Sequence, residues 1–391
     1  MPVLTPDSAL SLGATWSQVR RSAHERAIAA PFPTIDEETW RYSRIGELDL
    51  ATFAIAETPT TITGESSQVT VTRVPASSAG VDSSLADLFA QSTSTDLFNS
   101  LNLAHMDVVV VSVARGVVAP QPIVITHTLN GDGSVYFPRL VINAAENSEV
   151  TVVERFISDD GVRSLVVPVL DARAAQSARI RYLAINELGD KSWQIGEHDS
   201  VGERDSDTLL ATVALGGDYA RVSTAARLRG QGSNTRQVAL YFAGGTQMHD
   251  FRTLQEHAAP RTTSDLLFKG AVQDTAKSVY TGLIKIHNNA KGSVAYQTNR
   301  NLTLSHGAWA ESVPNLEIET NDVKCSHAST VGPIDEDQLF YLESRGVNPD
   351  VAQRLVVLGF FDEVLAQLPV GDLAAPLRQR VAQKLSIGDP S

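Results

Sequence analysis

The feature that most constrains this fold is a series of short β-branched runs between Asp107 and Asp322. Runs such as Val108–Val111, Ile123–Ile125 and Leu140–Ile142 are separated by Gly, Asn, Asp and Ser. About ten such runs, bounded by turn residues and with few helical windows among them, indicate an all-β architecture. A sandwich, a barrel and a solenoid all fit this pattern.

A weak internal repetition favours the solenoid. Small or polar residues precede an apolar position at 175–180, 217–222, 274–279 and 290–294. Stacked coils produce such echoes, because each coil turns a tight corner before an inward-facing residue. The spacing of the echoes is irregular, so the repetition alone leaves the sandwich open.

Helical patterns flank the strand-rich region on both sides. Apolar residues recur at helical intervals over 16–30 and 85–103. Beyond Pro333 a helix is expected to end at Gly346, because glycine is preferred just past a helix C-terminus. We therefore expect a mainly helical N-terminal region at 1–104, a β core at 105–333 and a helical C-terminal region at 334–391.

The C-terminal region contains a helix with two apolar stripes. Asn348 supplies its N-cap, and Pro349 its first turn. One helix in a short tail rarely needs two apolar faces for its own packing. The first stripe consists of Val351, Leu355, Leu358, Phe361, Leu365 and Leu368, and the second of Val357, Phe360 and Val364.

Composition limits the possible function classes. The 391 residues include 32 Lys and Arg against 45 Asp and Glu, which gives a formal net charge of −13. This balance provides no electrostatic footprint for nucleic acid. The dense apolar run Leu355–Phe361 is too short to cross a membrane, and the first residues lack the pattern of a signal peptide. We therefore expect a cytoplasmic protein that binds neither nucleic acid nor membrane.

The single cysteine, Cys325, limits the metal chemistry. One thiol cannot form an internal disulfide, and it cannot supply all the ligands of a structural zinc or an iron–sulfur cluster. Residues two apart in an extended segment share a face, so Cys325 and His327 would lie side by side. This pair suits iron or zinc, and the neighbouring Lys324 is expected to lower the pKa of the thiol. A cysteine that is simply buried is the competing interpretation.

The segment around this pair carries a family resemblance. The matching segments are Leu316–Ile318, Asp322–His327, Thr330–Gly332, Asp335–Leu342 and Ser344–Val347, with further matches at Glu38–Ser43, Asp250, Thr253, His257, Ala259-Pro260, Lys269-Gly270 and Asn299–Ser305. They resemble the C-terminal signature of the SufB/SufD family of iron–sulfur cluster assembly proteins, and the length and single cysteine of the chain resemble the SufD branch of that family. The chain departs from the family pattern at Arg252, His306 and Ala328. A role attached to the histidine that often stands at the position of Arg252 is therefore not carried over, and Ala328 in place of the usual glycine changes the backbone freedom next to His327.

The resemblance implies a right-handed parallel β-helix core flanked by helical regions. It implies a non-catalytic scaffold subunit of the SUF assembly complex, which pairs with SufB through the β-helix. The ATPase SufC, which hydrolyses ATP, would bind the C-terminal helices. The residues expected to contact SufC are Leu339, Phe340, Val357, Phe360, Phe361 and Val364.

The resemblance also implies a role for the Cys325 and His327 pair. His327, with Cys325 beside it, is expected to contact iron or a nascent cluster at the SufB interface. The cluster would be transient, and no cofactor is expected to bind stably to the chain alone. A site shared between two subunits fits a chain with one thiol, because the other ligands would come from the partner.

Two alternatives remain open at this point. A calcium-dependent carbohydrate-active enzyme would share the β-helix fold, although such proteins are generally exported. A purely structural SufD-like homodimer would share the sequence signature, with Cys325 in a structural position.

Overall fold

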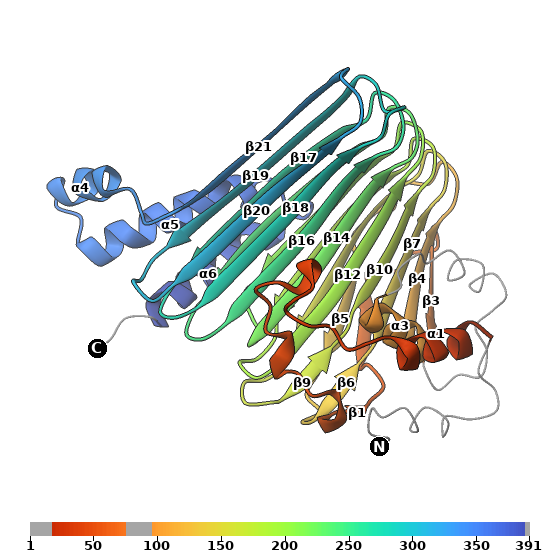
Figure 1. The fold of residues 1–391 in the computed structure, drawn as a ribbon, viewed down its shortest axis with the longest axis horizontal. Helices are drawn as coiled ribbons and strands as arrows, with labels where there is room; N and C mark the ends of the chain where they lie inside the picture. Colours follow the sequence, from red (N-terminus) through yellow and green to blue (C-terminus); the bar gives the residue numbers. More distant parts are fainter. Residues whose placement is uncertain (1–17, 76–95, 388–391) are drawn as a thin grey trace.

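The main body of the computed structural model, which describes residues 18–75 and 96–387, is a parallel β-solenoid (Figure 1). From β7 onward the long strands alternate between two sheets. Sheet A has 12 strands, with the main path β20-β18-β16-β14-β12-β10-β7-β4-β3, and sheet B has nine, in the order β2-β5-β8-β11-β13-β15-β17-β19-β21. The prediction of a parallel β-helix core with helices at both ends is confirmed.

Short elements precede the solenoid. The helix expected over 16–30 is present as α1, and the pattern over 85–103 is realised as α3, while residues before 18 and over 76–95 lie outside the described chain. The elements are α1 (Gln18–Ala29), η2 (Glu38–Trp40), η3 (Ile45–Glu47), η4 (Leu50–Thr52), β1 (Ala54–Ile55), β2 (Thr60–Thr63), β3 (Val69–Val74) and α3 (Leu97–His105).

The solenoid strands lengthen toward the C-terminus. The early strands are β4 (Asp107–Val113), β5 (Ile123–Thr128), β6 (Ser134–Tyr136), β7 (Pro138–Ala144), β8 (Glu149–Ile157), β9 (Ser164–Val166), β10 (Val169–Ala174), β11 (Arg179–Glu187) and β12 (Trp193–Gly202). The later strands are β13 (Asp207–Ala214), β14 (Tyr219–Leu228), β15 (Asn234–Ala243), β16 (Met248–His257), β17 (Thr263–Val272), β18 (Lys277–Ile286), β19 (Ser293–Thr303), β20 (Trp309–Ile318) and β21 (Val323–Gly332). Helices α4 (Glu336–Ser344) and α5 (Pro349–Leu365), the turn η5 (Gly371–Leu373) and α6 (Ala374–Ile387) follow.

Stacked corners hold successive coils in register. In one column of corners, a residue with positive φ recurs roughly every 30 residues. Its backbone N–H donates to the neighbouring coil, as Ser177 does to the carbonyl of Arg204 at 2.9 Å. Gly, Asn and Asp tolerate this conformation best, which explains the turn residues in the sequence. The corner residues are Asn147, Ser177, Asp205, Gly232, Arg261 and Gly292.

The echoes in the sequence mark these corners. The echoes at 175–180 and 290–294 contain Ser177 and Gly292, and those at 217–222 and 274–279 contain Gly217 and Asp274 of a second column. The residue after the corner is not always β-branched, since at the last echo the buried positions are Ser293 and Ala295 rather than Val294. The repetition in the sequence therefore reflects the residues needed at the backbone corners more than the residues of the core.

The two ends of the solenoid differ. At the N-terminal end, β2 pairs antiparallel with β5, and β3 pairs antiparallel with β4. The remaining pairings between the named strands of the described chain are parallel, up to the last two strands, β20 and β21. The solenoid therefore begins with short reversed strands and ends with long parallel ones.

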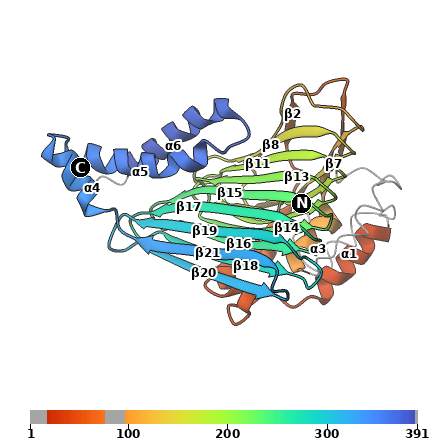
Figure 2. The ribbon, with the colours of Figure 1, turned by 90° about the horizontal axis from the view of Figure 1, so that it is seen from above.

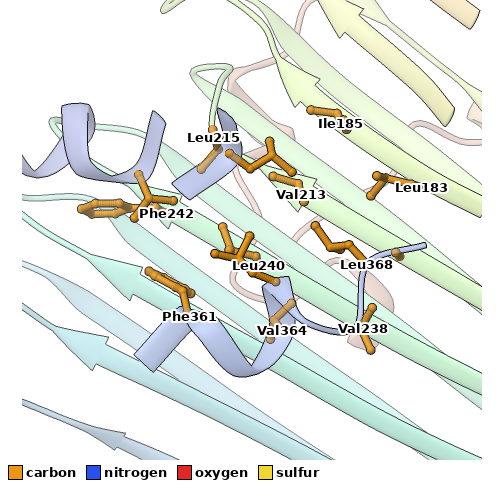
Figure 3. Close-up of a cluster of buried hydrophobic side chains, with 14 of the residues drawn as sticks. Leu183, Ile185, Val213, Leu215, Val238, Leu240, Phe242, Phe361, Val364 and Leu368 are labelled. Carbon is orange, nitrogen blue, oxygen red and sulfur yellow. The ribbon is translucent and has the colours of Figure 1, made fainter. Parts of the chain in front are cut away.

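The outer faces of both sheets are covered. Helix α5 and the segment after it lie on the outer face of sheet B, where Phe361, Val364 and Leu368 pack on strand residues (Figure 3). The N-terminal segment crosses the outer face of sheet A with Trp40, Phe53 and other apolar side chains. The strand residues labelled in Figure 3 are Leu183, Ile185, Val213, Val238, Leu240 and Phe242, and Leu215 directly follows β13. No helix in the described ranges is long and apolar enough to cross a membrane.

Candidate functional site

The last coil of the solenoid presents two strand edges that pair with no other strand in the described chain, and together we call them the open end. β20 is the last strand of sheet A, and β21 is the last strand of sheet B, and they lie near each other (Figure 2). Each is ten residues long, and their side chains are half-buried or exposed. The free N–H and C=O groups of a long edge strand form a template for another chain. The open end is therefore the part of the β core best suited to bind a partner.

Cys325 and His327 lie on β21, on the face that points into the solenoid. In the parallel register, Cys325 pairs with Ala295 and His327 with Gln297. Both β19 residues are buried, and paired positions on neighbouring strands share a face. Cys325 is half-buried against a small apolar cluster that includes Ile284 and Ala295, whereas His327 is exposed. The structure thus places the thiol and the imidazole on one face, as the spacing predicted.

The expectation that Lys324 lowers the pKa of the Cys325 thiol is not met. Partial burial raises the pKa of the thiol instead. Lys324 is exposed and, as the neighbour of Cys325 in an extended strand, projects to the opposite face. In the free chain the thiol is therefore mainly protonated near neutral pH.

The Cys325 and His327 pair is not part of a larger ligand set in this chain. Within residues 18–75 and 96–387 no three His, Cys, Asp or Glu side chains are grouped closely enough to hold a metal ion. Iron and zinc sites in proteins normally use more than two protein ligands. The pair can contribute a thiol and an imidazole to a site, and a complete site needs ligands from elsewhere.

The C-terminal helices present a second exposed surface, but three of the expected partner-binding residues lie elsewhere. Val357, Phe361 and Val364 are fully buried against sheet B, so they are not accessible to another chain in this arrangement. Both apolar stripes of α5 contribute to this packing, because the outer face of sheet B is itself apolar. Leu339 and Phe360 are partly buried against the same cluster.

The exposed apolar residues on α4 and α5 are different from most of those expected. Phe340 keeps 71% of its surface exposed, and its neighbour Tyr341 keeps 57%. Val351 and Leu355, from the N-terminal half of α5, are 45% and 47% exposed. We call these four residues the helical patch. Exposed apolar side chains of this size on one hairpin are typical of a protein-binding surface.

A polar cluster on the outer face of sheet A, which we call the clasp, was not predicted from the sequence. Asp250, on β16, is fully buried and forms ion pairs with Arg221 and with Arg252, whose Nε lies 2.8 Å from its Oδ1. Arg221 also donates to the carbonyl of Thr39, and its guanidinium lies 4.0 Å from the centre of the Trp40 ring. The clasp thus fastens the N-terminal segment to the sheet.

A groove of about 970 Å³ runs beside this clasp. Its walls include Asp96, which caps α3, and Glu197, which accepts a hydrogen bond from Asn99 at 2.8 Å. Burial raises the pKa of both carboxyl groups. Asp96 and Glu197 are about 100 residues apart, so the sequence did not predict that both line one groove. The Thr39-Trp40 segment, which matches the family pattern and also lines the groove, was the one available signal of a site there.

The comparisons with known proteins agree with the fold. Residues 127–360 match the family model described as "SUF system FeS cluster assembly, SufBD core domain". The chain is 36% identical to an iron–sulfur cluster assembly SufBD family protein of Mycobacterium tuberculosis, over 74% of this chain and 73% of that protein. It is 30% identical to SufD of Escherichia coli, over 71% and 67% of the two chains. It is 27% identical to SufD of Bacillus subtilis, over 70% and 63%. The chain therefore belongs to the SufB/SufD family of iron–sulfur cluster assembly proteins.

Proposed function

We propose that this chain is a SufD-type, non-catalytic scaffold subunit that helps to form a nascent cluster where its open end meets a SufB-type partner. The observation that carries the proposal is the position of Cys325 and His327 on an unpaired edge strand. Iron or the cluster would be the cargo of the complex and not a resident cofactor. The partner would supply the ligands that this chain lacks.

The open end supports pairing with SufB. A partner strand along β20 or β21 would satisfy the free backbone groups and would bring its own side chains next to Cys325 and His327. The exposed apolar side chains Leu316, Ile318 and Val331 lie on the same two strands and would be removed from water. One contact would therefore both join the subunits and complete the site.

The helical patch supports binding of the ATPase SufC. α5 is anchored on sheet B through Phe361 and Val364, whereas Phe340 and Tyr341 on α4 project into solvent. A movement of α4 and α5 would pass to sheet B through this anchor. We therefore assign the ATPase contact to the helical patch and to the exposed part of Phe360, and ATP hydrolysis to the ATPase chain.

The test is reconstitution of the chain with its SufB-type and SufC-type partners from the same host. Iron and acid-labile sulfide would be measured in the purified complex, with wild-type chain and with His327→Ala. His306→Ala serves as a matched control, because His306 is also exposed but lies in the turn before β20. We expect His327→Ala to lower the cluster content while the complex still assembles, and His306→Ala to leave it unchanged.

Two results would count against the proposal. Full cluster content with His327→Ala would remove the role of the imidazole. A stable homodimer by analytical ultracentrifugation that does not bind the SufB-type partner would favour the structural homodimer. The carbohydrate-enzyme alternative has no support from the family assignment, and no group of three His, Cys, Asp or Glu in the described ranges could hold calcium.

A further inference from the structure

Polar side chains join the apolar ones inside the C-terminal half of the solenoid. Around the early coils the inward residues form one apolar cluster, which includes Val111, Ile142 and Val152. Further along, buried side chains with hydrogen-bonding groups lie beside a second cluster, which includes Tyr241 and Phe251. Several of these groups have no hydrogen-bond partner among residues 18–75 and 96–387, namely Thr208 Oγ1, Thr235 Oγ1, Gln255 Oε1 and both side-chain amide atoms of Gln237 and Gln297.

These unpartnered groups are fully enclosed. Gln237 and Gln255 are 0% exposed, Thr208 and Gln297 are 2% exposed, and Thr235 is 3% exposed. A buried polar group that lacks a partner is expensive, so native proteins normally pair such groups with protein atoms or with bound water. Two complete side-chain amides without partners call for a bound species that can both donate and accept hydrogen bonds.

The groups are aligned in two rows that end at the candidate site. In the register of sheet B, one row runs from Thr208 through Thr235, Ser264 and Ala295 to Cys325. The second row runs from Leu210 through Gln237, Leu266 and Gln297 to His327. The alternate residues Leu209 and Val238 pack under the helices on the outer face, so both rows point inward.

Sheet A contributes polar groups from the opposite side. The Gln255 Nε2 donates to the Ser264 hydroxyl at 2.7 Å, and the His257 Nε2 lies 2.8 Å from the same oxygen. Gly282 lets the Gln297 Nε2 and the Tyr280 hydroxyl approach the backbone closely, because a Cβ at residue 282 would lie 2.2 Å from the first and 2.3 Å from the second. Donors and acceptors from both sheets thus converge just inside the open end.

We propose that the C-terminal half of the lumen binds water molecules at its unpartnered polar groups, from Thr208, Thr235 and Gln237 to Gln297, the register neighbour of His327. Water can donate to and accept from each unpartnered amide, and buried water usually makes about three hydrogen bonds. The water at Gln297 gives the His327 imidazole a hydrogen-bonding environment from inside the solenoid. That environment persists when another chain covers the open end.

The test is a crystal structure of the full chain at a resolution that shows bound water, together with ¹⁷O relaxation dispersion of water in solution. We expect ordered water within about 3.2 Å of the side-chain amides of Gln237 and Gln297. The double variant Gln237→Met with Gln297→Met should lose about two long-lived waters from the dispersion amplitude. Leu210→Met, in the same row, is the control and should keep the wild-type amplitude.

The wild-type crystal structure decides the matter even if the double variant fails to fold. An electron-density map with no water next to the side-chain amides of Gln237 and Gln297 overturns the proposal. A double variant that folds and keeps the full dispersion amplitude also overturns it. Thr235→Val provides a milder change, because it removes one hydroxyl at nearly constant volume. The Thr235→Val variant should lose the water next to residue 235 and keep the other buried waters.

Discussion

The packing of α5 on sheet B predicts opposite outcomes for two phenylalanines of the C-terminal region. Phe361 is fully buried, with its ring centre 6.5 Å from that of Phe242 and 5.1 Å from that of Phe360. Phe340, on α4, is 71% exposed. Replacing a buried Phe by Ala costs about 3–5 kcal/mol through lost burial and the cavity left behind, whereas exposed substitutions usually stay within about 0.5 kcal/mol.

The effect of Phe361→Ala should be local, because the solenoid coils have their own apolar core. The α5 and α6 helices would open from sheet B more often, and amide hydrogen exchange measures this opening directly. A loss of about 3–5 kcal/mol corresponds to a decrease in the protection of α5 amides of about 150- to 4000-fold. The protection of β11 to β15 amides should change much less.

Phe340→Ala is the matched control for stability and the test for binding. It should leave the protection of α5 unchanged, and it should weaken capture of the SufC-type ATPase in a pull-down experiment. Equal loss of protection in the two variants, or full protection of α5 in Phe361→Ala, would refute the packing argument. Unchanged ATPase capture by Phe340→Ala would show that Phe340 does not contribute to the proposed ATPase contact.

Three further predictions concern stability. Asp250→Asn should lower the free energy of unfolding in urea by about 3–5 kcal/mol, because it leaves two arginines without their buried carboxylate, while the exposed Asp36→Asn should have little effect. Burial lowers the pKa of His257 from 6.5 to about 4, so the unfolded chain binds the extra proton between these pH values and stability should fall as pH drops through that window. His257→Gln should reduce this slope, and an unchanged slope would contradict the assignment. Gly359→Ala should raise the melting temperature, because no atom lies where the added methyl group would be and alanine stabilises a helix by about 0.5–1 kcal/mol relative to glycine. Gly270→Ala should lower the melting temperature, because the added methyl group would overlap the buried ring of Tyr241.

Local features of the fold could be predicted from the sequence. The β-branched runs became strands because alternation and turn residues act over a few positions. Gly346 has positive φ, and Asn348 accepts a hydrogen bond from the backbone of Asp350, so both helix boundaries followed from the cap residues. The division into three regions at 104 and 333 stays a prediction.

The packing of α5 could not be predicted from its own two stripes. Periodicity shows which residues share a face, but it does not show how wide a surface the helix will meet. The missing information lay in the strands, since Leu183 and Ile185 make β11 apolar on its outer face as well as inside. A strand that is apolar on both faces indicates that something covers it.

Only the part of the candidate site that depends on local strand geometry could be predicted. Cys325 and His327 share a face because the period of a strand is two, and the same rule sends Lys324 to the other side. The clasp was not predicted because Asp250, its partner Arg221, and Thr39, whose carbonyl accepts from Arg221, are far apart in the sequence. Only the three-dimensional path of the N-terminal segment brings them together.

The difference between the two ends of the solenoid sets the size of an assembly. A partner chain that joins this one through β20 and β21 uses two ten-residue edges. At the other end, the terminal strands of the described chain are β1, β2 and β3, which have two, four and six residues, and β2 and β3 run antiparallel to their neighbours. Short, reversed strands are poor templates for further pairing. Strand pairing at this end is therefore disfavoured, and such an assembly would not grow into the fibre that an open β-solenoid could otherwise form.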